Sequence, residues 1–252
     1  MSVDLEWWFQ QATVRVGELW IPGRQAESTL ARYTKQLFCL THHADYPYCF
    51  LGSATGISYD GKYFMAWCRH QTRDYAPDDV TIPVEGGKTI ISGEQYLFVT
   101  PTEVNRDEDY TDLCAMQFVP ERYGVGNLAA DFFSIRTDEL WRGDDAPLFV
   151  FGYPTALRRV DYEEPHVHVT QVVTSARYLG PSNATYLHRV ALQRTQTFPL
   201  DGLSGGPVYH LSKNKKGFFI GLAGISVRGG GELLYFLDAR FLVEMLRKQS
   251  SG

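Results

Sequence analysis

The sequence predicts an all-β protein. Aromatic residues make up 14% of the 252 residues, with 15 Tyr and 15 Phe, and such residues favour strands. From about residue 37, short runs rich in Val, Ile, Phe and Tyr are separated by Gly, Asp and Pro. Several short strands with regularly spaced turns are typical of a β-sandwich or of β-barrels. Strands and helices do not alternate, which disfavours a parallel sheet.

The first 36 residues form an N-terminal extension in this interpretation. It holds one short strand near Val14–Val16 and a helical stretch over residues 26–35, both predicted from residue propensities. Two long apolar runs follow, YCFLGSATGISY and KYFMAW, and the Asp60-Gly61 pair between them predicts a β-hairpin.

Further strand-like runs continue to about residue 238, interrupted over residues 120–146 by a stretch that we interpret as a connection between two halves. The chain ends in a predicted helix, DARFLVEMLRKQSSG. Asp238 is placed to cap its first turn, and the apolar residues, among them Phe241 and Leu242, share one face.

Composition limits the partners that we expect. With 24 basic and 29 acidic residues the formal charge is −5, so the chain lacks the basic surface typical of nucleic-acid binders. It also lacks an apolar stretch of the roughly 20 residues needed to span a bilayer. The N-terminus shows neither the positive charge nor the apolar segment of a signal peptide. We therefore expect a cytoplasmic protein that binds neither nucleic acid nor membrane.

Cys39, Cys49, Cys68 and Cys114 are the four cysteines, and none of them belongs to a CxxC pair. In the cytoplasm, reduced and packed thiols are expected rather than disulfides or a zinc ribbon. The His166-x-His168 pair has no cysteine or carboxylate partners at zinc-site spacing, so we expect packed or surface histidines. The sequence predicts no metal and no cofactor.

The segment Asp201–Pro207, DGLSGGP, is the most informative one. Glycines weaken a strand interior but allow sharp turns that present backbone amides. A serine nucleophile needs that setting, because its attack on a carbonyl creates an oxyanion that backbone N–H groups stabilise. Ser204 is the candidate nucleophile, with the amides of Gly202 and Ser204 as oxyanion donors. The alternative interpretation is a glycine-rich turn with a bystander serine.

Chain order separates two kinds of serine hydrolase. Gly202-x-Ser204-x-Gly206 also fits the nucleophile elbow of α/β-hydrolases, which requires an acid and then a histidine after the serine. Here the only later histidine, His210, precedes the only later aspartate. The elbow is therefore rejected.

The partners of Ser204 must then lie upstream. His70 follows an apolar strand, and Asp112 opens an alternating one, DLCAMQF. Asp109 is the main competitor for the acid, and we prefer Asp112 because the strand begins there.

Together with these residues, the surrounding segments make the sequence similar to the trypsin-like (chymotrypsin-fold) serine peptidases of the bacterial intracellular kind. GSATGISYDGKYFMAWCRHQ, DLCAM, FGYP, GLSGGPV and GLAGISVRGG are similar to family segments and occur in the family's order over about residues 47–240. The resemblance implies two antiparallel six-stranded β-barrels followed by the C-terminal helix. Residues 37–125 would form the first barrel, and residues 126–252 the connection, the second barrel and the helix.

The resemblance also implies a His70–Asp112–Ser204 triad in a cleft between the barrels. The residue six before the serine, Phe198, would lie at the base of the substrate pocket, with Val227, Arg228 and Gly229 as its wall. Because Phe198 is not acidic, we expect an uncharged substrate side chain there.

Two departures from the family bear on regulation. Cys68-Arg69-His70-Gln71 replaces the usual Ala-His-Cys block, so the family's disulfide beside the histidine is not expected. Leu203 stands where zymogen-type relatives have the aspartate that pairs with a freed N-terminus. Activation by cleavage is therefore not expected, and a regulatory protein partner is one way to order the loop.

The sequence leaves two hypotheses open. One is a serine endopeptidase acting on protein or peptide substrates, for which conditional activation in stress response or phage defence is a fitting role. The other is a catalytically silent interaction module on the same fold.

Overall fold

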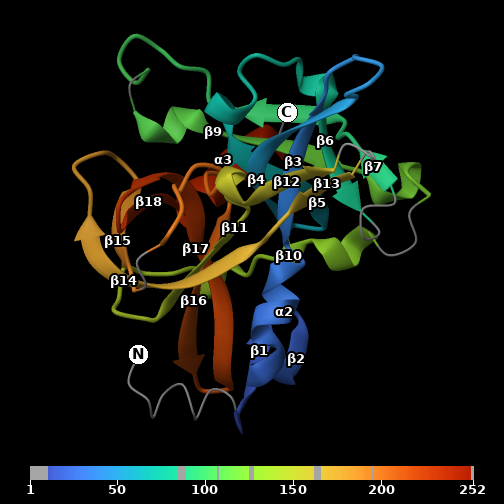
Figure 1. Ribbon diagram of the computed structural model, residues 1–252. Coiled ribbons are helices and arrows are strands. Elements are labelled where there is room, and N and C mark those ends of the chain that lie inside the picture. The colour runs from blue at the N-terminus through green and yellow to red at the C-terminus, as the bar shows by residue number, and fades with distance from the viewer. Residues whose placement is uncertain are drawn as a thin grey trace.

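Two β-sheets, each curled around its own apolar interior, make up most of the computed structural model (Figure 1). The structure describes residues 11–84, 89–106, 108–124, 128–161, 166–193 and 196–250. The strands are β1 (Thr13–Val16), β2 (Leu19–Pro22), β3 (Thr34–Leu40), β4 (Tyr48–Tyr59), β5 (Lys62–Cys68), β6 (Val80–Val84), β7 (Thr89–Ile91), β8 (Gln95–Phe98), β9 (Leu113–Phe118), β10 (Phe133–Ser134), β11 (Leu148–Gly152), β12 (Arg158–Asp161), β13 (His166–Val169), β14 (Val172–Pro181), β15 (Leu187–Leu192), β16 (Pro207–Asn214), β17 (Gly217–Gly230) and β18 (Leu233–Asp238). The α-helices of the described residues are α2 (Ala26–Ala31) and α3 (Ala239–Ser250), and several short 3₁₀ turns connect the strands.

The C-terminal sheet closes into a barrel. Its strand order is β16-β11-β14-β15-β18-β17, and β17 pairs back with β16, so six strands form a ring. The all-β prediction and the second six-stranded barrel are confirmed.

The N-terminal sheet departs from the predicted closed barrel of six strands. Its order is β7-β6-β3-β4-β5-β9-β8, and β10 pairs with β4. Among the described strands no ladder joins the ends β7 and β8, which are connected instead through residues 92–94. The sheet is therefore a half-barrel, and its two end strands are only three and four residues long.

The expected N-terminal extension contributes to both sheets. Its first ten residues lie outside the described part of the chain, but β1 pairs in parallel with β17 of the closed barrel. In Figure 1 the blue β1–β2 hairpin runs beside the red ends of β16 and β17. The predicted helix over 26–35 ends earlier, at Ala31, because the chain enters β3 at Thr34.

Local signals in the sequence produced the expected turns and cap. Asp60 and Gly61 both have positive φ, 50° and 71°, and connect β4 to β5 as a tight hairpin. The Asp238 carboxylate accepts a hydrogen bond from the Arg240 amide at 2.7 Å and so caps α3. Phe241 and Leu242 are buried on the inner face of that helix.

Alternation along β9 separates two apolar clusters. Leu113 and Ala115 face the cluster shared by α3 and both sheets, whereas Cys114 and Met116 face the interior of the half-barrel. Asp112 immediately precedes this doubly buried strand, so its position is fixed by the packing that follows it. In the described residues, no helix is both long and apolar enough to cross a bilayer.

Candidate active site

His70 and Asp112 are joined by two hydrogen bonds. β5 ends at buried Cys68, and His70 lies in the short 3₁₀ turn that follows it. The His70 amide donates to Asp112 Oδ1 at 2.9 Å, and His70 Nδ1 lies 2.6 Å from Asp112 Oδ2. An ionised carboxylate only accepts hydrogen bonds, so we assign the proton of the neutral ring to Nδ1. Nε2 is then the ring's proton acceptor.

Asp109, the competing acid, has a different partner. It pairs with Arg228 through two contacts of 3.1 Å that connect the two sheets. Burial raises the pKa of Asp109, which Arg228 opposes. The neighbouring Glu108 carboxylate accepts a hydrogen bond from the Thr185 amide at 3.3 Å. The turn that carries Asp112 is thus fastened to the closed barrel by the residues before it.

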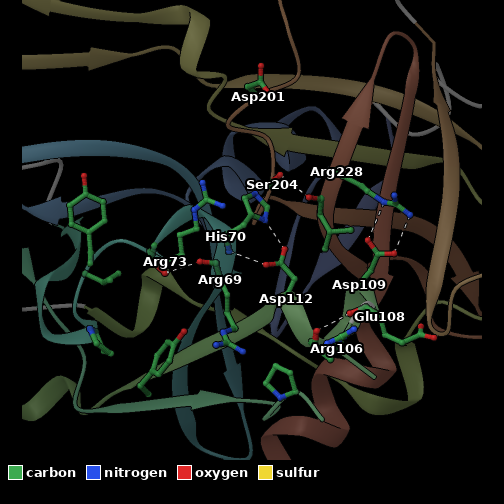
Figure 2. Close-up of a pocket in the computed structure, with 18 of the residues that line it drawn as sticks. Arg69, His70, Arg73, Arg106, Glu108, Asp109, Asp112, Asp201, Ser204 and Arg228 are labelled. Atoms are coloured by element: carbon green, nitrogen blue, oxygen red, sulfur yellow. Dashed lines mark hydrogen bonds and ion pairs between the residues drawn. The ribbon is translucent and has the colours of Figure 1, made fainter. Parts of the chain in front are cut away.

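Ser204 lies on the loop between Leu200 and β16. Its hydroxyl donates to the Val227 carbonyl at 2.9 Å, so in this structure the hydroxyl proton is directed to β17 rather than to the imidazole. Ser204, His70 and Asp112 all line one cleft (Figure 2). The hydroxyl must release the Val227 carbonyl before it can donate to His70.

At two positions of the loop around Ser204, the backbone angle itself favours glycine. Gly202 and Gly205 have φ of +90° and +84°, which side chains rarely adopt. A Cβ on Gly202 would lie 2.6 Å from the Tyr153 carbonyl oxygen, and one on Gly205 would lie 2.1 Å from that of Ser53. The glycine pattern noticed in the sequence therefore marks a backbone conformation and a close approach.

The amides of this loop divide into two groups. Leu203, Gly205 and Gly206 donate backbone hydrogen bonds to Leu200, Ser226 and Leu203, respectively. Within the described chain, the amides of Gly202 and Ser204 have no such acceptor. They are the two amides that the sequence predicts as oxyanion donors.

The cleft between the sheets has a volume of about 770 Å³. Its lining carries charges of both signs: Arg69, Arg73, Arg106, Arg228, Glu108, Asp109, Asp112 and Asp201. Arg69 lies over the Phe98 ring, 4.8 Å from its centroid. Because positive and negative side chains balance, the lining does not select a substrate by net charge alone.

Three of the four predicted pocket residues line this cleft. Val227, Arg228 and Gly229 do so, whereas Phe198 is absent from the described lining and Leu200 takes part in it. The Leu200 side chain packs on Gly229, with its Cδ1 2.9 Å from where a Cβ would stand. The position of Leu200 in the cleft could not be predicted, because nothing in the local sequence distinguishes one apolar residue of this loop from another.

The same corner contains one group of metal-ligating residue types. Cys68, His70 and Asp112 offer ligand atoms that all lie within 4.8 Å of one another. Complete burial raises the pKa of the Cys68 thiol well above its usual value, and metals bind the thiolate. The thiol donates instead to the Ser226 carbonyl at 3.5 Å. These residues therefore fit a hydrogen-bonded cluster better than a metal centre.

Comparisons with known proteins place the fold. No protein-family model and no curated protein matches the chain in sequence. Among solved structures, it resembles Rv3671c from M. tuberculosis H37Rv, crystallised as a serine-to-alanine mutant in an inactive form. The two share 14% sequence identity and a TM-score of 0.50, over 89% of this chain and 90% of the other. At this identity the likeness concerns the fold alone, and the fold is chymotrypsin-like, as the resemblance in the sequence implied.

Proposed function

We propose that the chain is a serine endopeptidase that cleaves peptide bonds of protein or peptide substrates through an acyl-enzyme. The observation that carries this proposal is the doubly hydrogen-bonded His70–Asp112 pair in the cleft that Ser204 also lines. The unengaged amides of Gly202 and Ser204 support it further. A binding module has no need for this combination.

The proposed reaction assigns defined roles to Ser204, His70, Asp112 and the amide of Gly202. Ser204 turns from Val227, gives its hydroxyl proton to His70 Nε2 and attacks the carbonyl carbon of the peptide bond. The amides of Gly202 and Ser204 hold the resulting oxyanion. His70 then protonates the leaving amine, and the acyl group stays on Ser204 until water removes it. Asp112 keeps the Nδ1 proton in place and stabilises the imidazolium.

The substrate side chain next to the cleaved bond is proposed to be uncharged. Leu200, Val227 and Gly229 supply apolar or small surfaces on the Ser204 side of the cleft. Because Leu200 already occupies the space beside Gly229, small side chains should fit there better than aromatic ones. Cleavage of a peptide library in which only this position varies tests the preference.

A silent interaction module is the second candidate. The observation in its favour is the Ser204 hydroxyl bound to Val227, which is an unproductive arrangement. If this arrangement persists with substrate present, the cleft binds peptides without cleaving them.

A fluorophosphonate probe tests the two candidates. An active serine peptidase is labelled on Ser204, and labelling is lost in Ser204→Ala and strongly reduced in His70→Ala. Ser28→Ala, which removes an exposed hydroxyl from α2, is the matched control and should be labelled like the wild type. Equal labelling of the wild type and Ser204→Ala would refute the peptidase proposal, as would a wild type that is not labelled across pH 6–9.

A further inference from the structure

The loop that carries Ser204 is fastened by its carbonyl groups. The Asp201 carbonyl accepts from the Thr155 amide at 2.8 Å, and the Gly202 carbonyl accepts from the Ser53 hydroxyl at 2.5 Å. The Leu203 carbonyl accepts from the Gly206 amide and from the Ser226 hydroxyl. Successive peptide units of the loop are thus held from outside it.

A hydrogen bond that fixes the direction of a carbonyl also fixes the direction of the N–H in the same peptide unit. In a trans peptide the C=O and the following N–H point in opposite directions. The bond from Thr155 to the Asp201 carbonyl therefore sets the direction of the Gly202 N–H. The bonds to the Leu203 carbonyl set the direction of the Ser204 N–H in the same way. The two proposed oxyanion donors are oriented by groups that are not among the residues lining the cleft.

Two of the fastening groups come from β4 in the other sheet. Ser53 is fully buried, and besides donating to Gly202 its hydroxyl accepts from the Tyr153 amide at 2.7 Å. Its carbonyl accepts from the Gln71 side chain at 3.2 Å, and Gln71 is the residue after His70. Ser53 therefore joins the His70 turn, the Ser204 loop and the end of β11.

Thr55 fastens the other end of the loop. Two residues after Ser53 on β4, it points to the same side of the strand. It is fully buried, and its hydroxyl donates to the Gly205 carbonyl at 2.7 Å. A buried carbonyl that loses its donor destabilises the conformation that exposes it. The loop is therefore held most firmly in the one conformation that these donors satisfy.

We propose that Ser53 and Thr55 are positioning residues that hold the Ser204 loop in a conformation ready for catalysis, so that neither proteolytic processing nor a partner protein is needed to order it. This inference rests on the proposed peptidase function. It differs from the expectation that a regulatory partner orders the loop. Leu203, the residue before Ser204, is apolar and buried and provides no charge for an ion pair.

Four variants test the proposal. Ser53→Ala and Thr55→Val each remove one donor, and Thr55→Ser keeps the donor while removing a methyl group. Thr34→Val is the matched control: Thr34 lies opposite Thr55 in the β3–β4 register, is equally buried, and has a hydroxyl without a hydrogen-bond partner in the described structure.

Two measurements are made on each full-length variant. Deuterium uptake, followed by mass spectrometry, reports the order of peptides covering residues 200–206, whether or not the protein is a peptidase. Steady-state hydrolysis of a peptide amide separates kcat from KM. We expect Ser53→Ala and Thr55→Val to take up deuterium faster in that segment and to lose about 10- to 100-fold in kcat with KM within about 3-fold. Thr55→Ser and Thr34→Val should match the wild type in both.

The outcomes separate this inference from the proposed function. If the loop segment of Ser53→Ala and Thr55→Val exchanges as slowly as that of Thr34→Val, the positioning role is refuted. If wild-type loop peptides exchange at the rate of unstructured chain, the claim that the loop is ordered without a partner is refuted. A protected loop in a protein that hydrolyses nothing would refute the peptidase function while supporting the fastening.

Discussion

Acid should destabilise the closed barrel through one buried histidine. His210 lies on β16, shortly after the Ser204 loop, and is only 2% exposed. Its ring nitrogens lie 3.0 Å from the Ser212 hydroxyl and 2.8 Å from the Glu139 carbonyl oxygen. Burial lowers the pKa of His210 to about 4, and the weaker influence of Asp144 acts in the opposite direction.

The magnitude follows from the two pKa values of His210. In the unfolded chain a histidine has a pKa of about 6.5, so on acidification the unfolded state binds the proton first. The stability that the neutral ring provides is therefore complete above about pH 6.5 and is lost as the pH falls from 6.5 towards 4. With about 1.36 kcal/mol for each pH unit between the two pKa values, the free energy of unfolding drops by about 3 kcal/mol.

Urea unfolding at several pH values between 7.5 and 4 measures this loss. His210→Gln does not titrate. Because it loses the packing and hydrogen bonds of the buried ring, it should be less stable than the wild type at pH 7.5. The difference between the two should then shrink by about 3 kcal/mol on going to pH 4. Ser28→Ala, which removes an exposed hydroxyl and no titratable group, is the control and should stay at a constant difference from the wild type. A constant difference for His210→Gln would refute the reasoning.

Three further predictions follow from the same structure. The arginine of the Arg228–Asp109 pair is half exposed, so the pair should contribute little to stability. A double-mutant cycle of Arg228→Met and Asp109→Asn, measured by urea unfolding, should give a coupling energy of about 0.5–1 kcal/mol, and strictly additive effects would contradict the pairing. Arg15 and Glu139 form a buried ion pair, so Arg15→Met alone should lower the free energy of unfolding by about 3–5 kcal/mol. Adding Glu139→Gln should recover part of that loss, and a double variant as unstable as the sum of the two single variants would contradict the pairing. All four cysteines are free and three are buried; a thiol-reactive dye should therefore modify Cys49 first in the native protein, and rapid modification of a second thiol would show that the packing is wrong.

Several local features of this fold could be predicted because their causes are local. A left-handed turn needs Asp-Gly, a helix start needs a capping side chain, and a sharp loop needs glycine, and each of these appears in the sequence where it acts. The Asp60-Gly61 hairpin and the Asp238 cap were predicted in this way and are confirmed. The order His70, Asp112, Ser204 could also be recognised in the sequence, and in the structure all three residues line one cleft.

The features that could not be predicted depend on contacts between distant segments. β1 joins β17 in parallel across some 200 residues, and no hydropathy pattern in a four-residue strand specifies that partner. The first sheet is a half-barrel whose end strands β7 and β8 do not pair in the described structure, whereas the resemblance implied a closed ring. Leu200 rather than Phe198 reaches the cleft, since the course of a loop without strand or helix periodicity depends on what it packs against.

In the Ser204 loop, the role of the glycines could be predicted from the sequence, whereas the role of Ser53 and Thr55 could not. A glycine is required by its own backbone angle and by the lack of room for a Cβ, so its position alone indicates a special conformation. Ser53 and Thr55 look like ordinary residues of a buried strand. Their hydroxyls gain a role only because the fold brings them to Gly202 and Gly205, which lie about 150 residues away in the sequence. Because a hydroxyl can donate only when an acceptor lies within about 3 Å, such a role exists only in three dimensions. The reactivity proposed for Ser204 therefore depends on both sheets, and a substitution in β4 should lower it just as a substitution next to the serine should.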